Sequence, residues 1–162
     1  MKIEKLSANG FRITDVFDSE LLAEICNLCD TMIATSTHTN GIAIREKINL
    51  SGTELKNKVA AALCSIFTAD IAGIELYRDY PGYTNAYHMD DPFTQNIIIV
   101  YLGDEDLAIG TGYIEQEHYT VPYKKNTAIM LSNSNKIMHG LIGQVPNNVI
   151  RKILYINWRN NE

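Results

Sequence analysis

The sequence predicts a mainly β fold, an antiparallel sandwich or jelly roll with two helices packed on one outer face of a sheet. From residue 71 onward, short β-rich segments alternate with turn signals, and eight strand candidates fit into about 90 residues. Two helical patterns are confined to the first 70 residues. The 162 residues are enough for one domain with a sizeable buried core.

The chain is expected to begin with a strand followed by a helix. Residues 11–17 alternate apolar and polar side chains, which is typical of a strand. Asp18 or Ser19 can then cap a helix that runs to about Met32. Its expected apolar face carries Leu22, Ile25, Cys26, Cys29, Met32 and Ile33.

A polar loop is expected at residues 34–41, followed by a short strand at 42–50. Ser51 and Glu54 fit a capping box, which predicts that a second helix starts there. The apolar stripe of that helix carries Leu55, Val59, Ala62, Leu63 and Ile66.

The strand candidates of the second part are separated by turn residues such as Pro81-Gly82. They lie at 71–80, 83–89, 94–102, 109–117, 118–123, 126–132, 136–142 and 149–158. The segment 94–102 is apolar on both faces, which predicts burial between a second sheet and the helices.

Bulk composition narrows the class of protein. The formal net charge of −5 provides no basic footprint, so a nucleic-acid partner is not favoured. No apolar run approaches the roughly 20 residues of a membrane helix, and the first residues lack a signal-peptide pattern. Three cysteines, Cys26, Cys29 and Cys64, do not fit a disulfide framework, and the first two are interpreted as small core side chains. We therefore expect a cytoplasmic protein without a membrane partner.

Residues 85–93, NAYHMDDPF, contain a histidine two places before an aspartate. In a strand, residues i and i+2 point to the same face, so His88 and Asp90 can reach one point. Asp91 points the other way and is a weaker ligand candidate. On spacing alone, the same pattern is also typical of a polar turn or a surface pair.

A third ligand has to come from the other histidines, which are His38, His118 and His139. His139 ends a strand candidate and precedes Gly140, which permits close backbone approach. His118 lies in a polar stretch and His38 in the early loop. Two histidines and one carboxylate form a facial triad that suits non-haem Fe(II), whereas four ligands close a structural zinc site.

Arg151 lies twelve residues after His139, in the last strand candidate. Alternation puts it on the same strand face as Ile153, Tyr155 and Asn157. An arginine inside a β fold is costly unless an anion meets it, so it can hold a dicarboxylate by a bidentate pair. The alternative is an arginine at a strand end in solvent.

From about residue 74 onward, the chain resembles the Fe(II)/2-oxoglutarate-dependent oxygenases, especially their prolyl-4-hydroxylase-like branch. The motifs that carry the resemblance are LYRDYPGYTNAYHMDDP, NIIIVYLGD, GTGYIEQE, the His-Gly of NTAIMLSNSNKIMHGL, and the arginine on the last strand. Their order and spacing agree over 85 residues, 74–158. The resemblance implies a double-stranded β-helix, with residues 1–162 as one domain. It divides this domain into a helical supporting lobe (1–70) and a jelly-roll core (71–162).

The resemblance also implies the roles of individual residues. His88, Asp90 and His139 would bind Fe(II), and Arg151 would pair with the distal carboxylate of the co-substrate 2-oxoglutarate. These residues would be the catalytic set.

Three other side chains are implied to lie near this set. Tyr101 matches a tyrosine that hydrogen-bonds the same carboxylate, with an ordinary buried strand tyrosine as the alternative. Tyr80 or Tyr77 would line the mouth of the pocket, and Asn157 would lie near the metal.

The implied reaction couples O2 and 2-oxoglutarate to oxidation of a C–H bond, with release of succinate and CO2. Hydroxylation is the expected outcome, desaturation and cyclisation are alternatives, and the carboxylate of Asp90 argues against halogenation. Two rivals are a cupin-like metal-binding module without oxidative chemistry and an inert jelly roll that acts as an interaction domain. The presence of all four residues of the implied catalytic set (His88, Asp90, His139 and Arg151) favours the oxygenase.

The sequence leaves the substrate of such an oxygenase open. It is either a small molecule, such as a free amino acid, or a peptidyl side chain, such as proline. The early loop and residues 90–95 are the candidate substrate contacts.

Overall fold

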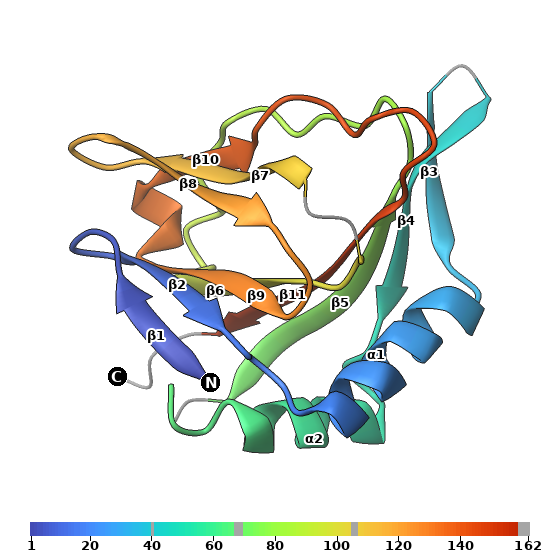
Figure 1. Ribbon diagram of the computed structural model, residues 1–162, viewed down its shortest axis with the longest axis horizontal. Helices are drawn as coiled ribbons and strands as arrows, with labels where there is room; N and C mark the ends of the chain where they lie inside the picture. The colour runs from blue at the N-terminus through green and yellow to red at the C-terminus, as the bar shows by residue number, and fades with distance from the viewer. Residues whose placement is uncertain (40, 67–69, 105–106, 159–162) are drawn as a thin grey trace.

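The computed structural model describes residues 1–39, 41–66, 70–104 and 107–158. In this part of the chain, a large and a small antiparallel sheet face each other, and two α-helices cover the outer face of the large sheet (Figure 1). The mainly β jelly roll with helices on one sheet, predicted from the sequence, is thereby confirmed.

The first part of the chain forms β1 (Lys2–Lys5), β2 (Gly10–Thr14), α1 (Ser19–Thr31), β3 (Thr35–Thr39), β4 (Ile42–Asn49) and α2 (Glu54–Ala62). The second part forms β5 (Ile71–Asp79), β6 (Asn96–Tyr101), β7 (Leu107–Ile114), β8 (His118–Tyr123), β9 (Thr127–Ser132), the 3-10 turn η1 (Ser134–Lys136), β10 (Met138–Leu141) and β11 (Arg151–Trp158). The large sheet has the order β1-β2-β9-β6-β11-β5-β4-β3, and the small sheet has the order β10-β7-β8.

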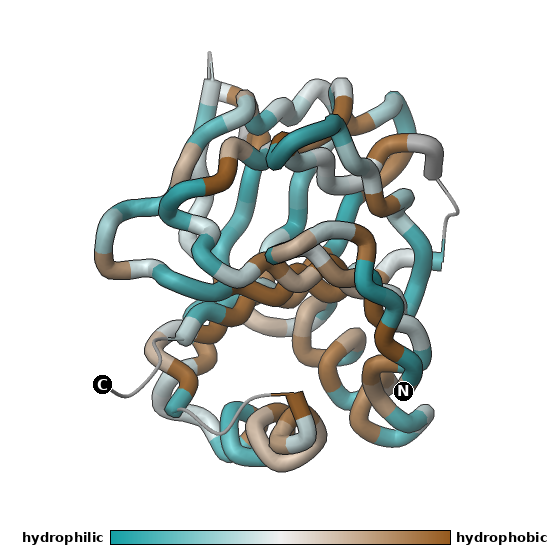
Figure 2. Tube along the Cα trace, turned by 90° about the vertical axis from the view of Figure 1, so that its left-hand side faces the viewer, coloured by the Kyte–Doolittle hydropathy of each residue, from teal (hydrophilic) through white to brown (hydrophobic). Residues whose placement is uncertain are grey.

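The two central strands of the large sheet are buried on both faces, as the apolar segment 94–102 predicts. In β6, Ile98 and Val100 pack toward the helices, while Ile97, Ile99 and Tyr101 pack toward the small sheet. β11 divides its side chains in the same way. Figure 2 shows hydrophobic residues gathered along the helices and the strands above them, and a more hydrophilic chain at the opposite end.

Helix α1 begins where the sequence predicts. The Asp18 carboxylate accepts a hydrogen bond from the Leu21 backbone N–H at 2.8 Å, which satisfies one free donor of the first turn. Cys29 is fully buried, and burial raises the pKa of its thiol to about 11. The expectation that Ile33 belongs to the buried face is wrong, because the helix ends at Thr31 and Ile33 is 97% exposed.

The predicted capping box of α2 is also wrong. The helix begins at Glu54 with Thr53 in the cap position, and Ser51 lies in the preceding turn. The Thr53 hydroxyl donates to the Leu50 carbonyl instead of capping the helix. Neither α-helix in the described residues has the length and apolar character to cross a membrane.

Three strand assignments differ from the sequence prediction. Residues 35–39, expected in a loop, form β3 on the edge of the large sheet, and residues 2–5 form β1 on its other edge. Residues 83–89, expected as a strand, make only an isolated bridge at His88. The first 70 residues therefore contribute four strands to the large sheet as well as both helices.

Candidate metal centre

Two segments that are far apart in the sequence bring the metal-ligand candidates together. His88 and His139 form a backbone bridge in which each N–H donates to the other residue's carbonyl at 2.9 Å. His139 lies in β10, and the segment before His88 runs against that strand. Gly140 makes this possible, since an added Cβ would lie 2.8 Å from the Asn85 carbonyl oxygen and 2.9 Å from the Tyr87 nitrogen.

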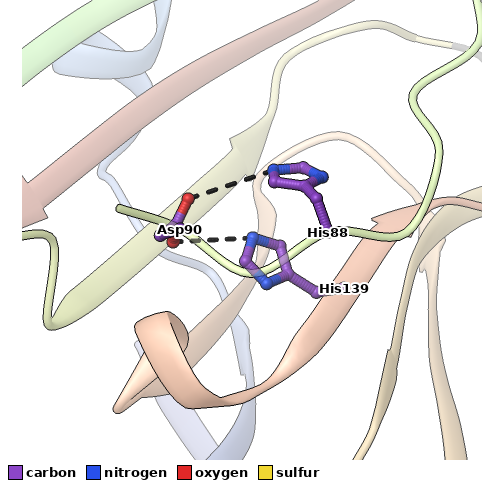
Figure 3. Close-up of side chains that lie close together, drawn as sticks. All are labelled: His88, Asp90 and His139. Carbon is purple, nitrogen blue, oxygen red and sulfur yellow. Dashed lines mark ion pairs between the residues drawn. The ribbon is translucent and has the colours of Figure 1, made fainter. Parts of the chain in front are cut away.

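The side chains of His88, Asp90 and His139 point toward one another (Figure 3). The His139 Nε2 atom lies 3.6 Å from Asp90 Oδ2, and the His88 Nε2 atom lies 4.0 Å from Asp90 Oδ1. One ligand atom from each residue lies within 4.8 Å of the others. The structure thus places the three ligand candidates from the sequence next to one another.

Both imidazoles have their second nitrogen fixed by a backbone carbonyl. His88 Nδ1 lies 2.9 Å from the Ala86 oxygen, and His139 Nδ1 lies 2.9 Å from the Ile137 oxygen. A carbonyl only accepts, so each Nδ1 carries a proton, and Nε2 is the nitrogen that faces Asp90 and is left for a metal ion. Metal-binding histidines are commonly oriented in this way.

The burial of His139 and of Asp90 Oδ2 also favours the binding of a metal ion. The His139 side chain is 4% exposed, and burial is the main cause that lowers the pKa of His139, which favours the neutral imidazole that a metal requires. Asp90 Oδ2 is buried and has no hydrogen-bond partner among the described residues. A buried carboxylate oxygen without a partner is costly, and a cation between Asp90 and the two histidines would satisfy it. The residues fit a divalent metal ion.

These three residues form part of the wall of a cavity of about 310 Å³. The large sheet lines one side of the cavity with Arg45, Glu75, Tyr77, Ile99, Arg151, Ile153, Tyr155 and Asn157. Thr111 of β7 lines it from the small sheet. Alternation along β11 places Arg151, Ile153, Tyr155 and Asn157 together on this wall, as predicted from the sequence. The volume is at the lower end of the range for small-molecule sites.

Arg151 is not at a solvent-exposed strand end. Its side chain is 4% exposed, and its Nη1 donates to Asp79 Oδ2 at 2.7 Å. Arg151 Nε is buried and has no hydrogen-bond partner among the described residues. The arginine is thus held by one carboxylate and retains a free donor.

Arg45 in the cavity wall and Asp79 behind it do not appear among the candidates from sequence. Asp79 is fully buried, and Arg45 binds both of its carboxylate oxygens, at 2.5 and 3.1 Å. Asp79 is the last residue of β5 and lies two residues after Tyr77. Alternation along the strand therefore predicts that Asp79 is on the same face of the sheet as Tyr77. No local pattern marks Arg45.

The structure distinguishes between the alternatives for the candidate tyrosines. Tyr80 does not line the cavity, and its hydroxyl donates to Glu46 at 2.7 Å; Tyr77 lies in the wall instead. Tyr101 is fully buried behind the wall. Its hydroxyl donates to the Val121 carbonyl and accepts from the Thr111 N–H, at 3.2 and 3.1 Å.

The weaker candidates have other partners. Asp91 accepts hydrogen bonds from the backbone of Phe93 and Thr94, so its carboxylate stabilises the turn after Asp90. His118 Nε2 lies 2.6 Å from the Tyr87 hydroxyl, and His38 is exposed on β3.

No protein-family model and no curated protein matches the chain by sequence. Solved structures match it in fold. HygX from Streptomyces hygroscopicus, solved with nickel and 2-oxoglutarate bound, has a TM-score of 0.73 at 9% identity, covering 93% of this chain and 82% of its own. The non-heme alpha-ketoglutarate-dependent epimerase SnoN from nogalamycin biosynthesis has a TM-score of 0.73 at 11% identity, covering 94% and 78%.

A third match is a prolyl hydroxylase from Trichoplax adhaerens in complex with a hypoxia-inducible-factor peptide fragment. Its TM-score is 0.70 at 11% identity, over 94% of this chain and 84% of its own. These similarities extend over nearly the whole chain. Because the sequence identity is only 9–11%, they show a shared fold and nothing more. The protein has the double-stranded β-helix fold of the 2-oxoglutarate- and Fe(II)-dependent oxygenases.

Proposed function

We propose that the protein is an Fe(II)- and 2-oxoglutarate-dependent dioxygenase. The observation that carries the proposal is the composition of one cavity, whose wall holds both the His88, Asp90 and His139 cluster and the buried Arg151. A cation site and an anion site in one small polar cavity fit a co-substrate that chelates a metal at one end and carries a carboxylate at the other.

The three ligand candidates would hold Fe(II) through His88 Nε2, His139 Nε2 and an Asp90 oxygen. Three protein ligands would leave further coordination positions for a co-substrate, unlike a structural site that four protein ligands close. When bound, Fe(II) and 2-oxoglutarate supply the chemistry, in which O2 is activated with release of succinate and CO2 and a substrate C–H bond is oxidised. The chain supplies placement: the fixed Nδ1 protons orient both imidazoles, and the buried wall limits access of water.

Arg151 would bind the distal carboxylate of 2-oxoglutarate through the donors that Asp79 leaves free. Its burial strengthens such a charge-assisted pair, because little water competes with it. Tyr101 is not assigned to this carboxylate, since its hydroxyl is hydrogen-bonded to backbone groups.

Hydroxylation of a small molecule or of a peptidyl side chain is the reaction that we propose. Support comes from the neighbours: HygX is also solved with hygromycin B bound, and the Trichoplax enzyme is solved with a peptide fragment. His88 lies on the open side of the metal cluster with 41% of its side chain exposed, so a substrate of either kind can reach the site. The cytoplasmic setting expected from the sequence stays a prediction.

The test is an anaerobic titration of metal-free protein with Fe(II) and then 2-oxoglutarate, followed by visible absorption. We expect a charge-transfer band when 2-oxoglutarate chelates the iron. Asp90→Ala should abolish the band, because the metal loses its carboxylate ligand. Arg151→Met should require about 100-fold more 2-oxoglutarate, since a buried charge pair with the co-substrate is lost.

Arg12→Met is the matched control, because Arg12 pairs with Glu4 on β1 and β2, outside the cavity lining. It should titrate like the wild type. A folded wild-type protein that binds Fe(II) without developing the band would contradict the proposal and favour a cupin-like metal module. A band with succinate release on addition of air would open a substrate screen.

A further inference from the structure

Three charged residues form a row across adjacent strands of the large sheet. Arg45 of β4 pairs in register with Asp79 of β5, and Asp79 pairs in register with Arg151 of β11. Residues in register on neighbouring strands point to the same face of the sheet. Arg45 and Arg151 line the cavity, and Asp79 is buried behind them. The carboxylate stands between two guanidinium groups.

The contacts within the row are close and buried. Asp79 Oδ1 accepts from Arg45 Nε at 2.5 Å, and Asp79 Oδ2 accepts from Arg45 Nη2 at 3.1 Å and from Arg151 Nη1 at 2.7 Å. Side-chain exposures are 21% for Arg45, zero for Asp79 and 4% for Arg151. Such charges interact strongly, because the surrounding protein screens them less than water does.

The charges in the row do not cancel. Two guanidinium groups and one carboxylate give the row itself a net charge of +1. Burial acts to lower the pKa of Arg45, but the hydrogen bond and charge of Asp79 outweigh it, so the guanidinium stays charged. Without Arg45, the negative charge of Asp79 would cancel the positive charge of Arg151, and the net charge of the row would be zero.

A second set of contacts fixes Arg45 in its place. Its guanidinium carbon lies 4.3 Å from the ring centre of Tyr77 and 4.1 Å from that of Tyr83. Both distances are within the range of cation–π attraction. The bidentate contact with Asp79 and the two aromatic faces leave this side chain little freedom to turn toward a ligand itself.

We propose that Arg45 is a positioning residue that makes the anion site work, because it neutralises Asp79 and leaves Arg151 free to bind the carboxylate end of the co-substrate. This inference rests on the proposed function, since it takes 2-oxoglutarate as the anion. Asp79 has a matching role: it holds the Arg151 guanidinium through Nη1, so that the unpartnered Nε and the remaining Nη2 are the donors left for the ligand. The functional unit is the row, and its net charge of +1 matches one carboxylate.

The test compares two keto acids binding to Mn(II)-loaded protein by calorimetry, a readout that involves no turnover. 2-Oxoglutarate has the distal carboxylate, and 2-oxobutyrate has the same chelating end without it. We expect Arg45→Met to weaken binding of 2-oxoglutarate by at least about tenfold, and to leave binding of 2-oxobutyrate unchanged. Arg45→Lys should retain most of the affinity because it keeps the charge.

The decisive variant is the double substitution Arg45→Met with Asp79→Asn. It removes one positive and one negative charge, so the net charge of +1 is restored on Arg151. We expect its affinity for 2-oxoglutarate to return to within about threefold of the wild type. If Arg45→Met alone does not fold, the double variant still tests the inference. It contains no buried, unpaired carboxylate at position 79, so we expect it to fold.

Three outcomes would overturn the inference. Arg45→Met could bind 2-oxoglutarate as the wild type does. The double variant could be as weak as Arg45→Met, which would mean that Arg45 contacts the carboxylate directly. Arg12→Met, the control outside the cavity lining, could show the same loss, which would make the effect one of overall charge. Failure of the proposed function looks different, because the wild type would then bind neither keto acid.

Discussion

Gly140 is the residue that allows the segments of His88 and His139 to meet. Its Cα faces the backbone of residues 85–87, and a Cβ at this position would lie within 3.0 Å of three backbone atoms. Backbone atoms cannot turn aside as a flexible side chain can. The distance between His88 and His139 therefore depends on the absence of one methyl group.

Gly140→Ala is expected to weaken metal binding by about 10- to 100-fold, the range in which supporting groups around a metal site usually act. The reason is that the segment carrying His88 and Asp90 must move away from β10. Isothermal titration with Mn(II) measures the change. Gly52→Ala is the control, because a Cβ at Gly52 has no neighbour within 4 Å. Equal affinities for Gly140→Ala and the wild type would show that the bridge tolerates the shift.

Single residues of the site differ in how well the sequence reveals them. His88 and Asp90 are two positions apart, so local alternation predicts that they point the same way. Arg45 and Asp79 are 34 positions apart and meet only because β4 pairs with β5 in one particular register. Pairing register depends on the whole sheet, and no pattern near residue 45 specifies it.

At the scale of elements, β11 joins the two halves of the structure. One face carries the site residues Arg151 and Tyr155, and the other face packs Leu154 and Trp158 against the helical side of the core. The strand lies between β5 and β6 in the middle of the large sheet. Its position therefore determines where Arg151 lies relative to His88, Asp90 and His139.

Leu154→Ala is expected to lower the free energy of unfolding by about 2–5 kcal/mol, because Leu154 is fully buried and its truncation leaves a cavity. Urea unfolding followed by circular dichroism measures this. Ile33→Ala, at a residue that is 97% exposed, should change stability by less than about 0.5 kcal/mol. A loss for Leu154→Ala as small as for Ile33→Ala would mean that the core beneath β11 can repack.

The elements that periodicity predicts correctly are those with a clear buried face. α1 and β6 have such faces, and their bounds agree with the sequence to within a few residues. β3 carries Thr, Ser and His and has no buried face, so its pairing with β4 is invisible in the pattern. Residues 83–89 contain aromatic residues typical of strands, but they form one β-bridge only, between His88 and His139 of the edge strand β10.

At the scale of the whole molecule, the metal cluster ties together two distant parts of the chain. His88 and Asp90 precede β6 in the chain, whereas His139 lies in β10. Strands β7, β8 and β9 and the turn η1 lie between β6 and β10 in the sequence. An unfolded chain does not hold these ligands in place, so a metal ion that binds them stabilises the folded state.

A divalent metal at 100 times its dissociation constant is expected to raise the free energy of unfolding by about 2.7 kcal/mol. Thermal denaturation of metal-free and Mn(II)-loaded protein measures the effect as a rise in Tm. In Asp90→Ala the rise should disappear. A rise of equal size in that variant would mean that the ion binds elsewhere on the molecule.

The central place of β11 has a consequence for how the protein is made. It is the last described strand in chain order, yet it fills the gap between β5 and β6. During synthesis of the chain, β5 and β6 have no β11 to pair with until residues 151–158 leave the ribosome. A chain that stops short of them has neither the completed sheet nor Arg151.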